Sequence, residues 1–302
     1  MEKPLKLISG DQVGIFAPSS PVKEPFRTGG IQKIKELGFI PMEINDIMSD
    51  SGVDFLAQPV QTGFDDIQQF LLDPNIKALW AARGGYGSNL LLTHFNLLKI
   101  PTPKIIMGAS DVTYLLTYIH DRFDMVVFYG PMAYASLPEN RFNEDNLRKT
   151  LSGDYSELTI PGEILSPGNV SAEIIGGCLS NLVSLLGTPW FPKIKGKILL
   201  LEDIGERPYR LDRMFWQLAS AGIFSQIRGL LLGQFPNCFT TPKEKEVFLN
   251  RVLIHTHPYN FPILYDLPVG HSDNIHAVPF GIPVELAPPG FNGISITEKG
   301  VQ

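Results

Sequence analysis

Residues 104–123, KIIMGASDVTYLLTYIHDRF, decide the fold class of this chain. The stretch opens with an apolar run, turns at Gly108 and continues with apolar residues at helical spacing. Residues 76–95, IKALWAARGGYGSNLLLTHF, repeat this order of strand, glycine-rich turn and helix. Short buried strands that alternate with helices are typical of βαβ units. The sequence therefore predicts an α/β fold with a mostly parallel sheet in its first half.

The second half of the chain begins after a segment with a different residue pattern and composition. The segment LSGDYSELTIPGEILSPGNVS, at 151–171, has no helical period and contains several glycines and prolines. We therefore expect an N-terminal α/β domain over 1–155, a linker over 156–169 and a C-terminal domain over 170–302. Strand and helix patterns resume in the second half, but its tail from residue 261 is rich in Pro, Gly and β-branched residues. That tail predicts short strands and turns, so we expect a smaller, mixed and β-rich C-terminal domain.

Composition and charge exclude several classes of function. The 302 residues suffice for about two domains, and 44% apolar with 19% charged residues is typical of a globular protein. The net charge of −6 provides no basic field for nucleic acid. No apolar stretch approaches the roughly 20 residues that cross a bilayer, and the N-terminus lacks the apolar region of a signal peptide. We therefore expect a cytoplasmic protein without nucleic-acid or membrane partners. Its two cysteines do not make a disulfide framework.

The motif RGGYG, at 83–87, directly follows the strand pattern IKALWAA. In open α/β sheets, ligands bind beyond the carboxyl ends of the strands, and paired glycines let backbone N–H groups approach a ligand closely. A tight turn without a ligand is an equally good interpretation of this segment alone. The spacing matches neither G-x-G-x-x-G nor a P-loop, so nucleotide binding is not supported.

The motif GASD, at 108–111, lies between the strand and the helix of the opening stretch. A serine on such a turn projects its hydroxyl above the sheet edge, where the helix N-terminus supplies N–H donors for an oxyanion. Gly108 resembles the first glycine of a nucleophile elbow, whereas Val112 replaces the second. The alternative, which this segment alone favours, is that Ser110 or Asp111 only caps the helix.

The segment LLLEDIGERPYR, at 199–210, ends a very apolar strand with Glu202 and Asp203. A carboxylate at such a strand end can orient a histidine, or it can favour the N-terminus of the next helix. Glu206 competes for any acid role.

Two loop histidines follow in LPVGHSDNIH, at 267–276: His271 and, as the alternative, His276. An isolated loop histidine is more often a surface residue than a catalytic one. Together with the preceding motifs, however, it completes a set of serine, acid and histidine, which predicts a serine hydrolase.

A pair of histidines on a predicted helix does not make a metal site. His255 and His257 are two residues apart, so their side chains face in different directions, and no third ligand follows at zinc-like spacing. We therefore predict no metal.

The combination of RGGYG, G-x-S-D, LED-x-x-E-x-P-Y-R-x-D-R and a late GH resembles the LD-carboxypeptidases, the S66 family of serine peptidases that includes the muramoyltetrapeptide carboxypeptidases. The matching segments run from about Val13 to His271. The resemblance implies a Rossmann- or flavodoxin-like parallel-sheet N-terminal domain, followed by a smaller β-rich domain. It also implies that no cofactor is needed, and homodimers are common in this family.

The resemblance also implies a catalytic triad. The nucleophile of the G-x-S-D motif falls on Ser110, the acid of the L-E-D motif on Glu202, and the histidine of the late G-H pair on His271. The backbone N–H groups of Gly85 and Asp111 are then expected to form the oxyanion hole. The N-terminal domain would carry the nucleophile, and the C-terminal domain the acid and the histidine.

The implied substrate is a murein tetrapeptide, cut between the L-centre of a diamino acid and a terminal D-Ala. Its terminal carboxylate can be bound by an arginine fork, for which Arg83, Arg207 and Arg210 are the candidates. Arg83 ranks first because it lies beside the glycine turn, and we expect Gly84 and Tyr86 to contact the substrate with it.

Two other functions compete with this one. Within the family, an amidase inactivates a microcin-like acyl-sulfamoyl-adenylate and stacks the adenine on aromatic residues of an added loop. The three tryptophans of this chain lie in predicted strands, helices or short turns, so no such loop is evident. The other alternative is a non-catalytic binding protein, in which Ser110 only caps a helix.

Overall fold

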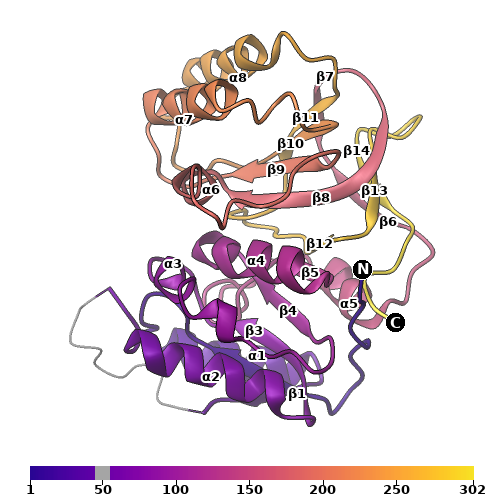
Figure 1. The fold of residues 1–302 in the computed structure, drawn as a ribbon. Helices are drawn as coiled ribbons and strands as arrows, with labels where there is room; N and C mark the ends of the chain where they lie inside the picture. The colour runs from indigo at the N-terminus through magenta and orange to yellow at the C-terminus, as the bar shows by residue number, and fades with distance from the viewer. Residues whose placement is uncertain (45–54) are drawn as a thin grey trace.

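The first sheet lies in the N-terminal half of the structure, a computed structural model that describes residues 1–44 and 55–302 (Figure 1). Its strand order is β12-β5-β4-β3-β1-β2. The strands are β1 (Gln12–Phe16), β2 (Ile40–Met42), β3 (Ile76–Ala81), β4 (Ile105–Gly108), β5 (Val127–Tyr129) and β12 (Val278–Phe280). Strands β1 to β5 pair in parallel, whereas β12 runs antiparallel to β5. The order β2-β1-β3-β4-β5 is that of a flavodoxin-like sheet, as the resemblance implies.

The central strands of this sheet are buried on both faces, and strands in that position consist of continuous apolar runs. All four residues of β4 are buried, as are five of the six residues of β3. The indole of Trp80, in β3, donates a hydrogen bond of 2.6 Å to the carbonyl of Pro131. The helices of this half are α1 (Phe26–Glu36), α2 (Val60–Leu72), α3 (Ser88–Leu91), α4 (Thr113–Phe123) and α5 (Glu144–Ser152), with 3-10 turns η1 (Phe95–Leu97) and η2 (Ser110–Val112).

The second sheet has the strand order β6-β14-β13-β8-β9-β10-β11-β7. Its strands are β6 (Leu158–Pro161), β7 (Glu163–Ser166), β8 (Val170–Cys178), β9 (Ile198–Glu202), β10 (Gly229–Gly233), β11 (Ile263–Leu267), β13 (Pro283–Leu286) and β14 (Gly293–Ile296). The central strands β8 to β11 are parallel, and antiparallel strands flank them on both sides. The helices of this half are α6 (Leu179–Ser184), α7 (Pro208–Ser220) and α8 (Pro242–Thr256). Across residues 1–44 and 55–302, no helix has the length and apolar content that crossing a bilayer requires.

The segment 156–169, for which the sequence predicts a linker, contains strands β6 and β7. They occupy opposite edges of the second sheet, where β6 pairs with β14 and β7 pairs with β11. Buried and exposed residues alternate along β6, so one face packs on the core and the other faces solvent. Two buried positions in a strand of four are too short a pattern to separate from coil in the sequence.

The two sheets meet through β12 and α4. Strand β12 belongs to the C-terminal half of the sequence, but it completes the first sheet by pairing with β5. Helix α4 packs on β4 and β5 and also contacts β8 and α6, so it lies between the two sheets (Figure 1). At the first residue of α4, the hydroxyl of Thr113 accepts a hydrogen bond of 3.1 Å from the backbone N–H of Cys178. The start of α4 is therefore held against the end of β8.

Candidate active site

Ser110 occupies the turn between β4 and α4, as the sequence predicts. Its φ of 58° lies in the left-handed region, which costs a residue with a Cβ of the order of 1–3 kcal/mol. A serine in a sharp turn between a strand and a helix is the geometry of a nucleophile elbow. Within the described residues, neither η2 nor α4 has a side-chain hydrogen bond at its N-cap. Ser110 therefore does not cap its own helix.

Asp111 holds the neighbouring RGGYG loop instead of capping its own helix. Its Oδ2 accepts the hydroxyl of Ser19 at 2.6 Å and the backbone N–H of Ser88, at the start of α3, at 2.7 Å. Burial raises the pKa of the Asp111 carboxyl, and the hydrogen bonds from Ser19 and Ser88 oppose that shift. Asp111 thus connects the turn after β4 with the turns after β1 and β3.

The RGGYG loop passes directly over Ser110. A Cβ on Gly84 would lie 2.7 Å from Cβ and 2.9 Å from Oγ of Ser110, so glycine is required for this close approach. Among the residues that the structure describes, the N–H groups of Gly85 and Asp111 form no hydrogen bond. Asp111 belongs to the first turn of a helix, whose N–H groups have no partner within the helix. Gly85 follows Gly84 and Asp111 follows Ser110 in the chain, so these two unpaired donors adjoin the close approach of Gly84 to Ser110.

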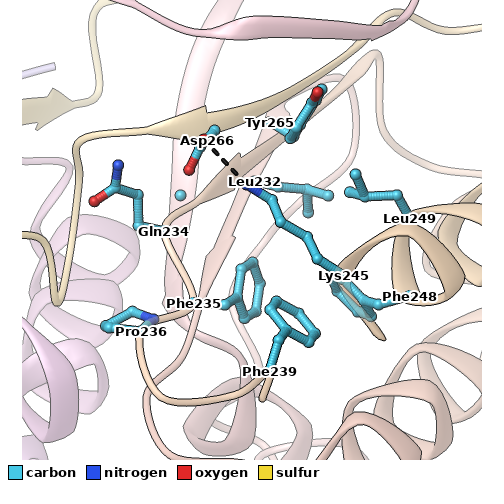
Figure 2. A pocket seen from close by; sticks show the side chains of 11 residues that line it. Leu232, Gln234, Phe235, Pro236, Phe239, Lys245, Phe248, Leu249, Tyr265 and Asp266 are labelled. Carbon is cyan, nitrogen blue, oxygen red and sulfur yellow. Dashed lines mark hydrogen bonds and ion pairs between the residues drawn. The ribbon is translucent and has the colours of Figure 1, made fainter. Parts of the chain in front are cut away.

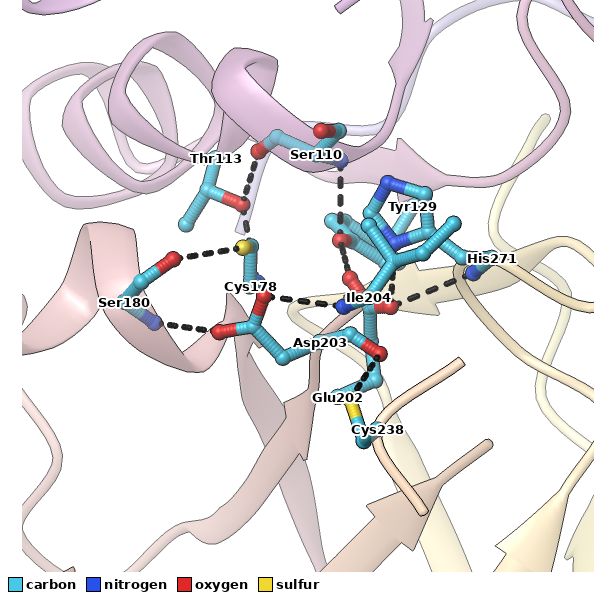
Figure 3. A network of polar contacts seen from close by, with 10 residues as sticks. All are labelled: Ser110, Thr113, Tyr129, Cys178, Ser180, Glu202, Asp203, Ile204, Cys238 and His271. Atoms are coloured by element: carbon cyan, nitrogen blue, oxygen red, sulfur yellow. Dashed lines mark hydrogen bonds and ion pairs between the residues drawn. The ribbon is translucent and has the colours of Figure 1, made fainter. Parts of the chain in front are cut away.

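Glu202, at the end of β9, is fully buried and contacts His271 directly (Figure 3). Its Oε2 accepts Nδ1 of His271 at 2.7 Å and the backbone N–H of the same residue at 3.1 Å. Its Oε1 accepts the hydroxyl of Tyr129 at 2.6 Å. Because Nδ1 donates to the carboxylate, Nε2 is the nitrogen that can accept a proton in the neutral imidazole.

Charge and burial act in opposite directions on His271. Burial alone lowers the pKa of its imidazole, but the charge of Glu202 and the hydrogen bond to it prevail and raise the pKa above its ordinary value. Burial and the charge of Glu202 raise the pKa of Tyr129 well above its ordinary value, so this phenol stays protonated and donates. The same hydroxyl accepts the backbone N–H of Ser110 at 3.0 Å. Tyr129 thus connects Ser110 with Glu202.

Ser110 and His271 line the same cavity, which has a volume of about 410 Å³. Within the described part of the chain, the Ser110 hydroxyl makes no hydrogen bond to the imidazole. Such bonds are often long in unliganded enzymes and tighten when substrate binds. Arg83, Gly84 and Gly85 also line this cavity. Tyr86 does not line it; its side chain is 44% exposed and packs edge-on against Phe55.

The other acidic and histidine candidates have different partners. Asp203 accepts the backbone N–H groups of Ser180 and Ile204, both at 2.9 Å, and burial raises the pKa of its carboxyl (Figure 3). Nδ1 of His276 lies 2.9 Å from the carbonyl of Asn274. Glu206 lines the cavity but forms an ion pair with Arg210 rather than with a histidine.

Tyr129 and Arg141 are absent from the sequence-based predictions. Tyr129 ends β5, the neighbour of β4, so a polar side chain at that strand end was the available signal. Arg141 lines the cavity from the irregular segment before α5, where nothing in the sequence distinguishes it from a surface arginine. Arg207 and Arg210 are not among the residues that line the described cavity.

A second cavity, of about 210 Å³, lies where β10 and β11 end (Figure 2). Phe235, Phe239 and Lys245 are among the residues that line it. Nζ of Lys245 lies 3.1 Å from Oδ2 of Asp266 and 5.5 Å from the ring centre of Tyr265. Its described lining includes no serine, cysteine or histidine. Of these two cavities, the larger one is therefore the one that combines a serine with a histidine.

Comparisons with known proteins give the family. The model for the LD-carboxypeptidase N-terminal domain matches residues 13–130, and the model for the LD-carboxypeptidase C-terminal domain matches residues 171–286. The chain is 33% identical over 288 residues to a probable murein peptide carboxypeptidase of Bacillus subtilis, across 92% of this chain and 89% of that one. The solved muramoyltetrapeptide carboxypeptidase of Oxalobacter formigenes matches with a TM-score of 0.82 and 25% identity, across 95% of this chain and 99% of that one.

The microcin C7 self-immunity protein MccF of Escherichia coli is also similar. It is 25% identical across 97% of this chain and 95% of its own. A structure of MccF has the same fold, with a TM-score of 0.88 over 99% of both chains at 22% identity. The two family models together span most of the sequence, in the order and over the regions that the motifs predict. The chain therefore belongs to the LD-carboxypeptidase family of S66 peptidases.

Proposed function

We propose that this protein is a serine L,D-carboxypeptidase that releases the terminal D-Ala of a murein tetrapeptide. The observation that carries the proposal is the arrangement around one cavity: Ser110, on a strained turn, and His271 both line it, and the buried Glu202 lies 2.7 Å from Nδ1 of His271. The names of the Bacillus subtilis and Oxalobacter formigenes relatives support a murein peptide as the substrate.

The proposed mechanism uses this arrangement for acyl transfer. Nε2 of His271 takes the proton of the Ser110 hydroxyl as its oxygen attacks the scissile carbonyl. Glu202 keeps the imidazole in the required tautomer and stabilises the imidazolium. The unpaired N–H groups of Gly85 and Asp111 bind the oxyanion. His271 then gives its proton to the leaving amine of D-Ala, and a water molecule activated by the same imidazole hydrolyses the acyl-enzyme.

Two arginines are placed to bind the carboxylate of the departing residue. Arg83 and Arg141 line the 410 Å³ cavity and also a neighbouring cavity of about 330 Å³. Nη1 of Arg83 donates to the carbonyl of Pro21 at 3.0 Å. Nη2 of Arg141 donates to the carbonyl of Ala135 at 2.7 Å, and its Nε donates to Oε2 of Glu139, also at 2.7 Å. These bonds hold each guanidinium while leaving other N–H donors for a carboxylate.

Release of D-Ala from a murein tetrapeptide, followed by mass spectrometry, tests the proposal. Wild type is expected to remove one D-Ala, and the Ser110→Ala variant none. Activity that survives in Ser110→Ala would reject this serine as the nucleophile. A folded wild type that releases nothing would reject the tetrapeptide as substrate.

The alternative substrate is an acyl-sulfamoyl-adenylate, since one solved MccF structure is a complex with aspartyl sulfamoyl adenosine. That structure is 22% identical to this chain, so it shows the shared fold alone. Among the described residues, no tryptophan lines the 410 Å³ cavity to stack an adenine. We therefore retain the tetrapeptide and propose a cofactor-free, cytoplasmic, homodimeric enzyme of peptidoglycan recycling.

A further inference from the structure

We infer that Glu206 binds a positively charged amino group of the substrate, on the acyl side of the scissile bond. This role makes Glu206 a specificity residue for the side chain that precedes the departing D-Ala. The inference rests on the proposed function, because it concerns the same cavity.

The inference starts from the position of the Glu206 carboxylate. Glu206 lies in the loop between β9 and α7 and lines the cavity of Ser110 and His271, and its side chain is 22% exposed. Its Oε2 is buried and has no hydrogen-bond partner among the described residues. Nε of Arg210 lies 3.2 Å from this same Oε2, so the oxygen has an ion-pair partner although the two make no hydrogen bond. Arg210 is 57% exposed, and ion pairs with exposed residues are weak. A buried acceptor without a hydrogen bond is unfavourable, and a ligand that brings N–H donors relieves this.

The neighbouring carboxylates are already occupied. Both oxygens of Glu202 accept hydrogen bonds, one from Tyr129 and the other from His271. Both oxygens of Asp203 accept backbone N–H groups. In the described lining of the cavity, Glu206 is therefore the carboxylate that remains for a ligand.

The arrangement of charge around the cavity determines the orientation in which a substrate fits. Arg83 and Arg141 lie on the side shared with the neighbouring 330 Å³ cavity, whereas Glu206 does not line that neighbour. Glu139 lines the neighbour as well and pairs with Arg141 at 2.7 Å, so Arg83 is the guanidinium on this side that has no carboxylate partner among the described residues. A substrate with a carboxylate at one end and an ammonium at the other therefore fits in one orientation. With the carboxylate of D-Ala on the arginines, the acyl-side residue lies toward Glu206. A diamino acid in that place presents the ammonium that Glu206 requires.

Three tetrapeptides that differ only at the residue before D-Ala test this inference. One carries lysine, one carries Nε-acetyl-lysine and one carries norleucine. Wild type is expected to show a kcat/KM at least tenfold higher for the lysine peptide than for either neutral peptide. In Glu206→Gln this ratio is expected to fall at least tenfold, mostly through KM, because an amide binds an ammonium less well than a carboxylate does. Glu206→Asp retains the charge and is expected to keep part of the preference.

Glu246→Gln is the matched control, since Glu246 is 61% exposed on α8 and pairs with Lys243. It is expected to leave the ratio unchanged. An equal loss on all three peptides in Glu206→Gln would assign Glu206 a structural role and overturn the inference. Equal use of the three peptides by wild type would overturn it as well.

A binding measurement separates this inference from the proposed function. Should folded wild type release no D-Ala from any of the three peptides, the proposed function fails. Calorimetry with the lysine peptide then compares Ser110→Ala with the double variant Ser110→Ala/Glu206→Gln. Binding at least tenfold tighter to the single variant supports the role of Glu206. Equal binding, or none to either variant, overturns it.

Discussion

The hydroxyl of Tyr129 donates a hydrogen bond of 2.6 Å to Oε1 of Glu202, the carboxylate whose other oxygen contacts His271. The same hydroxyl accepts the backbone N–H of Ser110. A residue of the first sheet therefore holds the carboxylate of the second sheet and, at the same time, the turn of the proposed nucleophile. This bond makes the relative position of the two sheets a condition for the proposed chemistry.

Tyr129→Phe is expected to lower both activity and stability. It leaves the Ser110 N–H and Oε1 of Glu202 without a partner, which costs about 1–3 kcal/mol of unfolding free energy. Because Glu202 is held less firmly, kcat is expected to fall roughly tenfold or more. Tyr155→Phe is the control, since it removes a largely buried hydroxyl that donates to the carbonyl of Glu298. Denaturant unfolding and D-Ala release measure both effects, and equal activity of the two variants would contradict the prediction.

Glu202→Gln is expected to move the acidic limb of the pH–rate profile to lower pH. The imidazole must be neutral to accept the Ser110 proton, so kcat/KM falls as pH drops through the pKa of His271. Glu202 raises this pKa, Asp203 acts in the same direction, and burial and Arg141 oppose them. Without the carboxylate charge, the lowering influences prevail.

The same substitution is expected to reduce kcat by about 10³–10⁴, because the imidazolium loses its partner. Profiles of kcat/KM between about pH 5 and pH 9 measure the limb. A limb that stays in place, or that moves to higher pH, would show that Glu202 does not set the protonation of His271.

Gly84→Ala is expected to reduce activity without unfolding the protein. The new Cβ would lie 2.7 Å from Cβ of Ser110, so either the hydroxyl or the loop must move. A displacement of about 1 Å costs on the order of 100-fold in rate. Gly63→Ala, in α2, is the control, because its nearest neighbour lies 3.5 Å from the added atom. Full activity in Gly84→Ala would mean that the loop is not held against Ser110.

Gly270→Ala is expected to separate His271 from Glu202. Gly270 has a φ of 86°, and a Cβ there would lie 2.2 Å from Cδ of Glu202. Gly290→Ala makes a matched comparison, since that glycine has a φ of 82° with no atom within 4 Å of the new Cβ. Both variants carry the backbone strain, of about 1–2 kcal/mol, and only the first carries the collision. D-Ala release should therefore be lost in Gly270→Ala alone; comparable activity in both would contradict the contact.

Local pattern was sufficient to predict the elements that carry the proposed site. Apolar runs and glycine turns predict the strand–turn–helix units of 76–95 and 104–123, because period and turn chemistry are properties of neighbouring residues. The order of motifs identifies the family and assigns roles to Ser110, Glu202 and His271, which the structure brings to one site. Whether Ser110 caps its helix stayed open in the sequence, because a cap and a nucleophile occupy the same kind of turn.

Tertiary structure alone decided how these elements meet. Glu202 contacts residues 69 and 73 positions away in the chain, His271 and Tyr129, and no local pattern encodes such pairs. Strand β12 completes the sheet of the other half, and the short strand β6 is stabilised by β14, far along the sequence. The sequence by itself determined which residues are candidates for the proposed chemistry and which turns present them. The packing of the two sheets against α4 determined that they share one cavity, because burial and hydrogen bonding select the partners only once distant segments are brought together.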